Sequence, residues 1–91
     1  MLETQTMPKI EIYTQPYCPY CARALALLEQ KGAVFTEISA PQGTAARAES
    51  TTRSGGRTSV PQTFINGQHV GGCDDLMALE RAGKLDALLA S

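Results

Sequence analysis

The chain of 91 residues is long enough for one small domain and too short for two. Hydrophobic residues make up 43% of it, so a core can form without disulfide bonds, and a net charge of −1 favours neither nucleic acid nor an anionic membrane as a partner. The longest apolar run, near residues 24–28, is far too short to span a bilayer.

The N-terminal segment MLETQTMPK lacks the basic-then-apolar order of a signal peptide. We therefore expect a cytoplasmic protein whose residues 1–91 form a single domain, with residues 1–7 as a disordered extension. Three cysteines are an odd number and too few for a disulfide scaffold. In a reducing compartment, Cys18 and Cys21 in the order Cys-Pro-Tyr-Cys indicate redox chemistry or metal binding.

The first predicted elements are a strand, a helix and a second strand. KIEIYT (9–14) alternates and is rich in β-branched and aromatic residues, as strands are. A helical pattern follows, with Cys21 and Leu28 on one apolar face and Gly32 at its end. AVFTEI (33–38) is the second strand, and a crossover of this length indicates parallel pairing with the first.

The second half of the chain predicts a weak helix, a hairpin and a last helix. GTAARAESTTRS (43–54) suits a helix at its start, but successive hydroxyl side chains compete for its backbone, which predicts a short or mobile helix. SVPQTFINGQHVGG (59–72) contains Asn66-Gly67 between two strand-like runs, which predicts a tight hairpin with a type I′ turn. A last helix from about Asp74 precedes a terminal turn or short helix at 85–89. This order predicts an α/β protein with a four-stranded mixed β-sheet flanked by about three helices.

A Cys-x-x-Cys pair at the entry of a helix suits thiol chemistry. The thiolate is the nucleophile, and the unpaired amides and dipole of a helix N-terminus stabilise negative charge on the first cysteine, Cys18. Two intervening residues bring Cys21 within bonding reach across one turn, where it can attack a mixed disulfide on Cys18. Pro19 fits the first turn because no amide hydrogen is needed there. We rank this interpretation above a pair of small buried residues.

A zinc site is the competing interpretation of the cysteines. His69 and Cys73 stand in His-x3-Cys spacing, so Cys18, Cys21, His69 and Cys73 could supply four ligands. The 47 residues between Cys21 and His69 exceed the gap of about 12 to 20 residues usual in zinc sites of this kind. We therefore rank zinc below redox chemistry, and we expect Cys73 to be a small packed residue.

Two further stretches suggest a ligand groove. Val60-Pro61 is either an ordinary strand start or a cis bond that exposes the Val60 backbone to an extended, peptide-like ligand. GGCDD (71–75) is either a turn with an N-cap or a carboxylate site on free helix amides, with Asp74 beside it for an ammonium group. Arg53 and Arg57 could meet a second, distant carboxylate. A ligand with an amino-acid head group would satisfy such a site.

Three motifs of the chain together resemble those of the dithiol glutaredoxins, in particular the small bacterial ones. They are YTQPYCPYC (13–21), RTSVPQTFING (57–67) and GGCDDL (71–76), and the resemblance runs from about Lys9 to Leu89. It implies a thioredoxin fold. It also implies a glutathione-dependent thiol-disulfide oxidoreductase of the cytoplasm that reduces protein–glutathione mixed disulfides and protein disulfides, with a part in electron transport and cell redox homeostasis.

The resemblance implies a role for each matched residue. Cys18 would be the nucleophile that accepts the glutathionyl group, and Cys21 would be the resolving cysteine used for protein disulfides. Val60, before a cis Pro61, would hydrogen-bond the cysteinyl backbone of glutathione, and residues 72–74 would hold its γ-glutamyl end. The whole groove would comprise Gln15, Tyr20, Arg57, Ser59, Val60, Pro61, Gly72, Cys73 and Asp74.

The resemblance also implies the partners. We expect glutathione as co-substrate, glutathionylated or disulfide-containing proteins as partners, no metal, and a monomer. One departure is Gln15, where the family usually has Lys or Arg; the missing cation predicts weaker glutathione binding, with Arg57 and Arg53 compensating. The alternative function is a carrier in which Cys18 and glutathione ligate an iron–sulfur cluster between two subunits, against which Pro19 argues by stiffening the loop.

Overall fold

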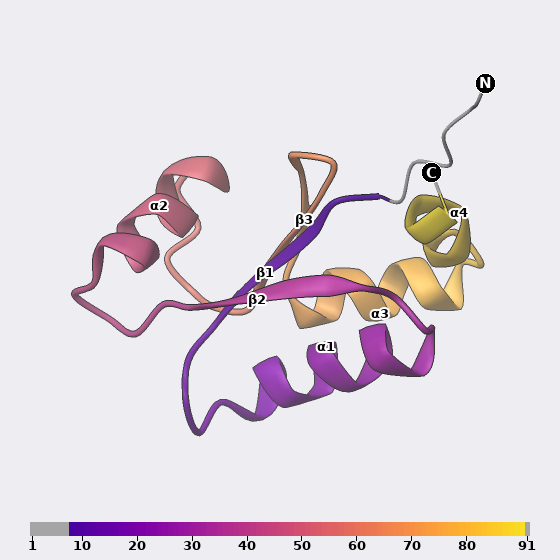
Figure 1. Cartoon of the computed structure of the whole chain (residues 1–91), viewed down its shortest axis with the longest axis horizontal. Helices are drawn as coiled ribbons and strands as arrows, with labels where there is room; N and C mark the ends of the chain where they lie inside the picture. Colours follow the sequence, from indigo (N-terminus) through magenta and orange to yellow (C-terminus); the bar gives the residue numbers. More distant parts are fainter. Residues whose placement is uncertain (1–7, 91) are drawn as a thin grey trace.

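The structure, a computed structural model, describes residues 8–90 and is built around one mixed sheet (Figure 1). Its strands are β1 (Ile10–Thr14), β2 (Phe35–Ser39), β3 (Gln62–Ile65) and β4 (Gln68–Gly71), in the spatial order β2-β1-β3-β4. β1 pairs parallel with β2 and antiparallel with β3, and β3 pairs antiparallel with β4. The predicted four-stranded mixed sheet is therefore confirmed. The predicted extension, residues 1–7, lies outside the described residues.

Four helices flank the sheet in the described range: α1 (Pro19–Gln30), α2 (Ala45–Arg53), α3 (Cys73–Arg81) and α4 (Leu85–Ala90). α1 and α3 cover one face and α2 lies on the other (Figure 1). The fourth, α4, is the short terminal helix that was expected as a turn or short helix at 85–89. It forms because Leu85 is fully buried in the core and Asp86 pairs with Lys31 of the α1 C-cap at 2.9 Å. No helix within residues 8–90 is long and apolar enough to cross a membrane.

Side-chain alternation along β1 divides the core into two clusters. Ile10 and Ile12 point to the α1 and α3 face, where they pack with Leu28. Tyr13 points to the α2 face, where its ring meets Phe64 edge-on at 5.7 Å between centroids. Each fully buried aliphatic side chain contributes about 1.5 to 3 kcal/mol relative to an exposed one. The end of β1 is thus fixed from both faces, which positions the loop that follows it.

Helix α2 spans nine residues and continues through the run of hydroxyl residues that was expected to weaken it. Ser50 in this run is fully buried. Arg53 pairs with Glu11 at 2.9 Å, donates to the Tyr13 hydroxyl at 2.7 Å and lies 4.1 Å above the Phe64 ring. These long-range contacts hold a helix that is poor in apolar residues. They also correct one expectation, because Arg53 is committed to the fold and does not face the ligand groove.

The predicted hairpin is confirmed in its turn type. Asn66 and Gly67 both have positive φ, 54° and 80°, as a type I′ turn requires. The Asn66 side chain accepts a hydrogen bond from the Lys9 amide at 2.9 Å, which fastens the hairpin to the start of β1. The start of β1 and helix α4 lie at one end of the molecule, and the loop from β1 to α1 lies at the other (Figure 1).

Candidate active site

Cys18 lies at the N-terminus of α1, in the loop that follows β1. It is the N-cap residue, and its Sγ accepts a hydrogen bond from the Cys21 amide at 3.1 Å. Tyr17 before it has φ of 59°, a left-handed conformation that turns the chain into the helix. The first turn of α1 carries no acidic residue. The amide and the helix dipole therefore stabilise negative charge on this half-buried sulfur, as the sequence predicts.

The other two cysteines differ from Cys18 because they are buried. Burial, followed by the hydrogen bond with Cys18, raises the pKa of Cys21 to about 12. Burial likewise raises the pKa of Cys73, which packs in the core cluster around Leu76. The site thus has one accessible sulfur with a protonated partner behind it.

An open groove of about 230 Å³ lies beside the Cys-x-x-Cys helix. The Val60-Pro61 peptide bond in its wall is cis, as the resemblance implied, and the Val60 carbonyl lies 4.0 Å from the Cys18 Sγ. The structure brings together all predicted groove residues except Gln15, and adds Asp75. The lining residues are Tyr20, Arg57, Ser59, Val60, Pro61, Gly72, Cys73, Asp74 and Asp75.

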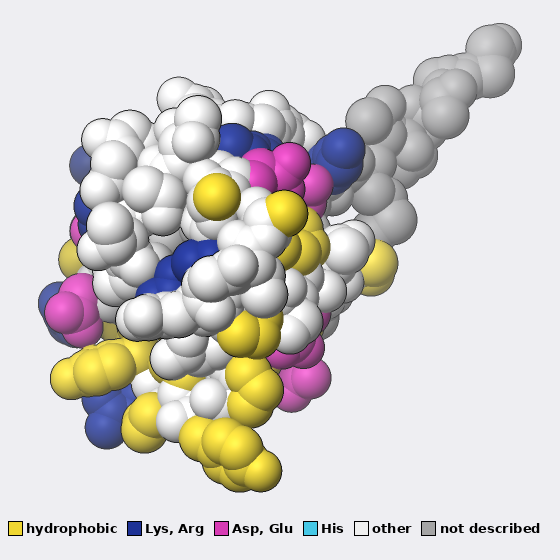
Figure 2. All heavy atoms as spheres, turned by 90° about the vertical axis from the view of Figure 1, so that its left-hand side faces the viewer, with side chains coloured by type: hydrophobic (Ala, Val, Ile, Leu, Met, Phe, Trp, Pro, Cys, Tyr) yellow, Lys and Arg dark blue, Asp and Glu magenta, His cyan; other side chains and the backbone are white. Residues whose placement is uncertain are grey.

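The surface around Cys18 is apolar and exposed. Tyr17 is fully exposed and Tyr20 is 55% exposed. Figure 2 faces this end of the molecule and shows hydrophobic side chains gathered along its lower edge. The thiol of Cys18 therefore lies within an exposed apolar surface.

Gln15 lies in a second hollow, of about 420 Å³, which also contains Cys18, Cys21 and Glu37. Its side-chain oxygen accepts a hydrogen bond from the Arg47 guanidinium at 2.9 Å. Arg47 comes from α2 and so places a cation beside the position where the sequence lacks one. Sequence reasoning missed this residue because 32 positions separate the two and no local motif connects them.

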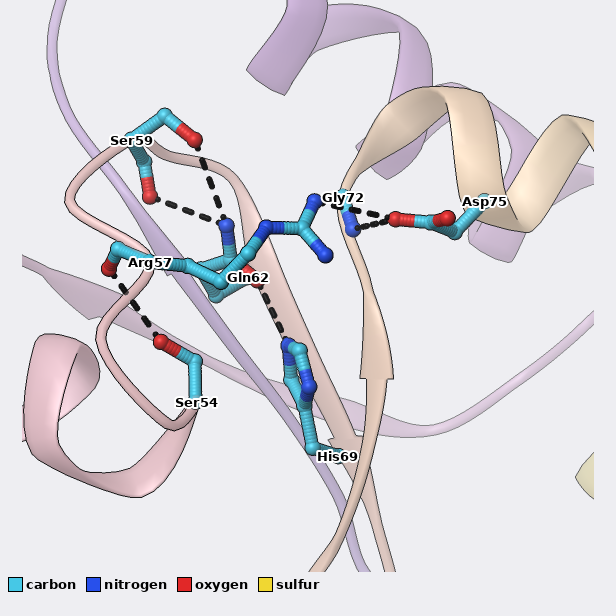
Figure 3. Close-up of polar contacts among 7 residues, drawn as sticks. All are labelled: Ser54, Arg57, Ser59, Gln62, His69, Gly72 and Asp75. Carbon is cyan, nitrogen blue, oxygen red and sulfur yellow. Dashed lines mark hydrogen bonds and ion pairs between the residues drawn. The ribbon is translucent and has the colours of Figure 1, made fainter.

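Asp75 is the second residue that sequence reasoning missed. Its carboxylate accepts hydrogen bonds from the Gly72 amide at 2.9 Å and from Arg57 at 3.1 Å (Figure 3). The Gly72 amide foremost, and then the Arg57 guanidinium, lower the pKa of Asp75. An acidic residue three positions after an N-cap is a known signal of this arrangement, and it could have identified Asp75.

The two glycines before α3 lie where a side chain would have little room. A Cβ on Gly71, whose φ is +125°, would overlap the Asp75 carboxylate, and one on Gly72 would lie 3.1 Å from the Pro61 carbonyl. Gly72 also has no side chain to cap the helix. The amides of residues 73 and 74 consequently have no acceptor in the described part of the chain, which leaves the start of α3 open toward an anion.

The four-ligand zinc arrangement is not formed. His69 Nε2 lies 2.7 Å from the side-chain oxygen of Gln62. Across residues 8–90, no three His, Cys, Asp or Glu side chains converge in a way that could hold a metal ion.

Comparison with known proteins decides the family. The Glutaredoxin family model matches residues 10–70. The chain belongs to the glutaredoxin family. It is 56% identical over 85 residues to a glutaredoxin of Pseudomonas aeruginosa, which covers 93% of this chain and 100% of that protein. Membership of the glutaredoxin family makes the chain a thiol-disulfide oxidoreductase.

Solved glutaredoxin structures share the fold. The solution structure of a glutaredoxin from Brucella melitensis has a TM-score of 0.81 and 60% identity, covering 92% of this chain and 90% of that one. The crystal structure of a buckwheat glutaredoxin–glutathione complex has a TM-score of 0.80 and 35% identity. The match covers 90% of this chain and 76% of that one. The predicted thioredoxin fold is therefore confirmed.

Proposed function

We propose that this glutaredoxin reduces protein–glutathione mixed disulfides, with glutathione as its reductant. The Cys18 thiolate attacks the glutathionyl sulfur, so that a Cys18–glutathione disulfide forms and the protein leaves as a thiolate that takes up a proton. A second glutathione, as thiolate, then attacks the glutathionyl sulfur on Cys18. Glutathione disulfide leaves and the Cys18 thiolate is regenerated, so the two electrons come from glutathione.

Protein disulfides follow a second branch that uses Cys21. Cys18 attacks the protein disulfide, and Cys21 then attacks Cys18 and releases the reduced protein, leaving a Cys18–Cys21 disulfide that glutathione reduces. Cys21 is adjacent and protonated, so it must lose its proton during this step. The reaction of Cys18 alone does not need the buried Cys21. It is therefore the favoured branch when the incoming partner already carries glutathione.

The observation that carries the proposal is the groove beside Cys18. The Val60 amide has no acceptor among residues 8–90 and can pair with the cysteinyl backbone of glutathione. The open amides at the start of α3 suit the γ-glutamyl carboxylate, and the exposed Asp74 suits its ammonium group. Arg47, beside Gln15, suits the glycyl carboxylate, whereas the Arg57 guanidinium lies at the start of α3, 3.1 Å from Asp75, and adds a cation at the γ-glutamyl end. The buckwheat relative is described as a glutathione complex, which supports this assignment.

The test compares glutathione-dependent turnover of a small glutathione mixed disulfide by wild type, Cys18→Ser and Cys21→Ser. Cys18→Ser should lose turnover. Cys21→Ser should retain it, because Cys18 alone carries the glutathionyl group, and should lose reduction of an intramolecular protein disulfide. A folded Cys21→Ser variant without mixed-disulfide turnover would contradict the proposal, since the cysteines would then act only as a pair or as ligands.

The alternative function, a carrier of an iron–sulfur cluster between two subunits, stays a prediction. A coloured, dimeric preparation that contains iron would support it and would contradict the proposed monomer. A colourless monomer with turnover would support the enzyme.

A further inference from the structure

The groove wall, residues 57–61, is held in place by hydrogen bonds from side chains that do not line the groove. The wall belongs to no helix or strand, so no strand partner pairs its backbone. Three consecutive carbonyls, those of residues 57, 58 and 59, instead accept side-chain hydrogen bonds, from Ser54 Oγ at 3.1 Å, Arg47 Nε at 3.0 Å and Gln62 Nε2 at 3.1 Å. The position of the Val60 amide in the groove therefore depends on donors outside the groove.

Gln62 is the innermost of these donors. Its side chain is fully buried, and its amide nitrogen also lies 3.4 Å from the Ser59 hydroxyl. Its oxygen lies 2.7 Å from His69 Nε2 (Figure 3). A buried amide is costly unless both of its ends are paired, and here Ser59 and His69 pair them.

The direction of the hydrogen bonds follows from chemistry. The Ser59 carbonyl can only accept, so the nitrogen of Gln62 must face it, and the oxygen of Gln62 must face His69. His69 Nε2 therefore carries a hydrogen and donates, in the neutral and in the charged ring. Burial, and then the charge of Arg57, lower the pKa of His69, which leaves the ring neutral around pH 7.

His69 is itself anchored on the sheet. It lies in β4 opposite Phe64, and the two rings are tilted with centroids 5.1 Å apart. The ring is thus fixed on one side by packing and directs its Nε2 at Gln62 on the other. Neither His69 nor Gln62 lines the groove.

We propose that His69 and Gln62 are positioning residues for glutathione, because the chain from His69 through Gln62 to Ser59 holds the Ser59–Pro61 wall in place. This rests on the proposed function. The wall binds the substrate while Cys18 performs the chemistry, so loss of the chain raises KM for the glutathione mixed disulfide and affects kcat little.

The first test is a set of variants at His69. His69→Leu removes the donor and should raise KM for a small glutathione mixed disulfide about two- to tenfold, the worth of one hydrogen bond, with kcat within about twofold. His69→Gln places an amide nitrogen near the position of Nε2 and should restore most of the loss. Gln68→Leu, on the same strand and outside the chain of hydrogen bonds, is the matched control and should leave KM unchanged.

A double-variant comparison tests whether His69 acts through Gln62. Gln62→Leu should raise KM like His69→Leu, and the double variant should be no worse than Gln62→Leu, because the chain is then already broken. Additive losses, or an unchanged KM in His69→Leu, would overturn the positioning role while wild-type turnover still supports the proposed function. A wild type without turnover of the mixed disulfide would overturn both.

A spectroscopic test is independent of turnover and of any folding defect in the variants. Nitrogen NMR of the wild-type imidazole around neutral pH should show His69 protonated at Nε2 and not at Nδ1. A ring protonated at Nδ1 would reverse the hydrogen bond to Gln62 and overturn the proposal.

Discussion

Cys18 and Cys21 are three positions apart on one helix, and burial gives their sulfurs different reactivity. We expect iodoacetamide near neutral pH to modify the reduced protein at Cys18 first. Cys21, with a pKa raised to about 12, and the buried Cys73 should react at comparable rates only after unfolding. Peptide mass spectrometry with and without urea measures this. Equal labelling of Cys73 in the folded protein would contradict it.

Arg47 supplies the cation that position 15 lacks, and this changes the expected effect of Gln15→Lys. That variant should still lower KM for a glutathionylated substrate, but a lysine there would stand next to Arg47, and repulsion would limit the gain. Arg47→Gln should raise KM about two- to fivefold, the range of a partly exposed ion pair. Adding Gln15→Lys to Arg47→Gln should recover the loss.

The control for this charge exchange is Arg81→Gln, an exposed arginine of α3 that lines neither hollow. It should leave KM unchanged. If Arg47→Gln behaves like Arg81→Gln, the cation near Gln15 has no part in substrate binding.

Local motifs predicted most of the residues that line the groove, and long-range pairs account for those they missed. Three short motifs were enough to predict these residues, because each fixes a backbone feature within a few positions. They are Cys-Pro-Tyr-Cys, Val60-Pro61 and the glycines before Cys73. The cation beside Gln15 comes from another element, and Arg53 is removed from the site by Glu11, 42 residues away. Such pairs depend on how the sheet brings distant segments together, which no local pattern encodes.

Among the elements, the turn between β4 and α3 is the most sensitive to one added carbon. Gly71→Ala must strain a φ of +125° and also displace the Asp75 carboxylate, whereas Gly32→Ala meets the φ penalty alone, with no atom within 4 Å of the new Cβ. We expect Gly32→Ala to lower the free energy of unfolding by about 1 kcal/mol, and Gly71→Ala to lower it distinctly more. Urea denaturation compares the two. Equal losses would show that the contact with Asp75 is unimportant.

The elements themselves were predictable where their signals are local. The type I′ hairpin follows from Asn66-Gly67, and α1 follows from its apolar face. Helix α2 forms despite its composition because Arg53 and Glu49 contact the hydroxyl of Tyr13, whose side chain points to the α2 face. Helix α4 forms because Leu85 is buried in the core. Both depend on tertiary contacts, which override local propensity.

Across the whole molecule, folding lowers the pKa of both His69 and Asp75, and this sets how stability depends on pH in acid. A group whose pKa is lowered binds protons more readily when unfolded, so stability is lost as pH falls. The loss should begin below pH 6.5, the ordinary value for His69, and continue below 3.8, the ordinary value for Asp75. Urea unfolding at several pH values measures it.

Two variants assign the two parts of that curve. His69→Gln should flatten the fall that begins below pH 6.5, and Asp75→Asn should flatten the further fall below pH 3.8. A curve that His69→Gln leaves unchanged would mean that His69 titrates alike in the folded and unfolded chain, in conflict with its half-buried position against the Phe64 ring.

The fold places the first strand's start and the last helix away from the reactive cysteine. Cys18 follows the C-terminal end of β1, while the start of β1 and helix α4 lie together at the opposite end of the molecule (Figure 1). A fluorescent protein or a solid support attached next to the start of β1 or to helix α4 would thus stand at the opposite end of the molecule from Cys18, and thiol exchange there should proceed as in the free protein.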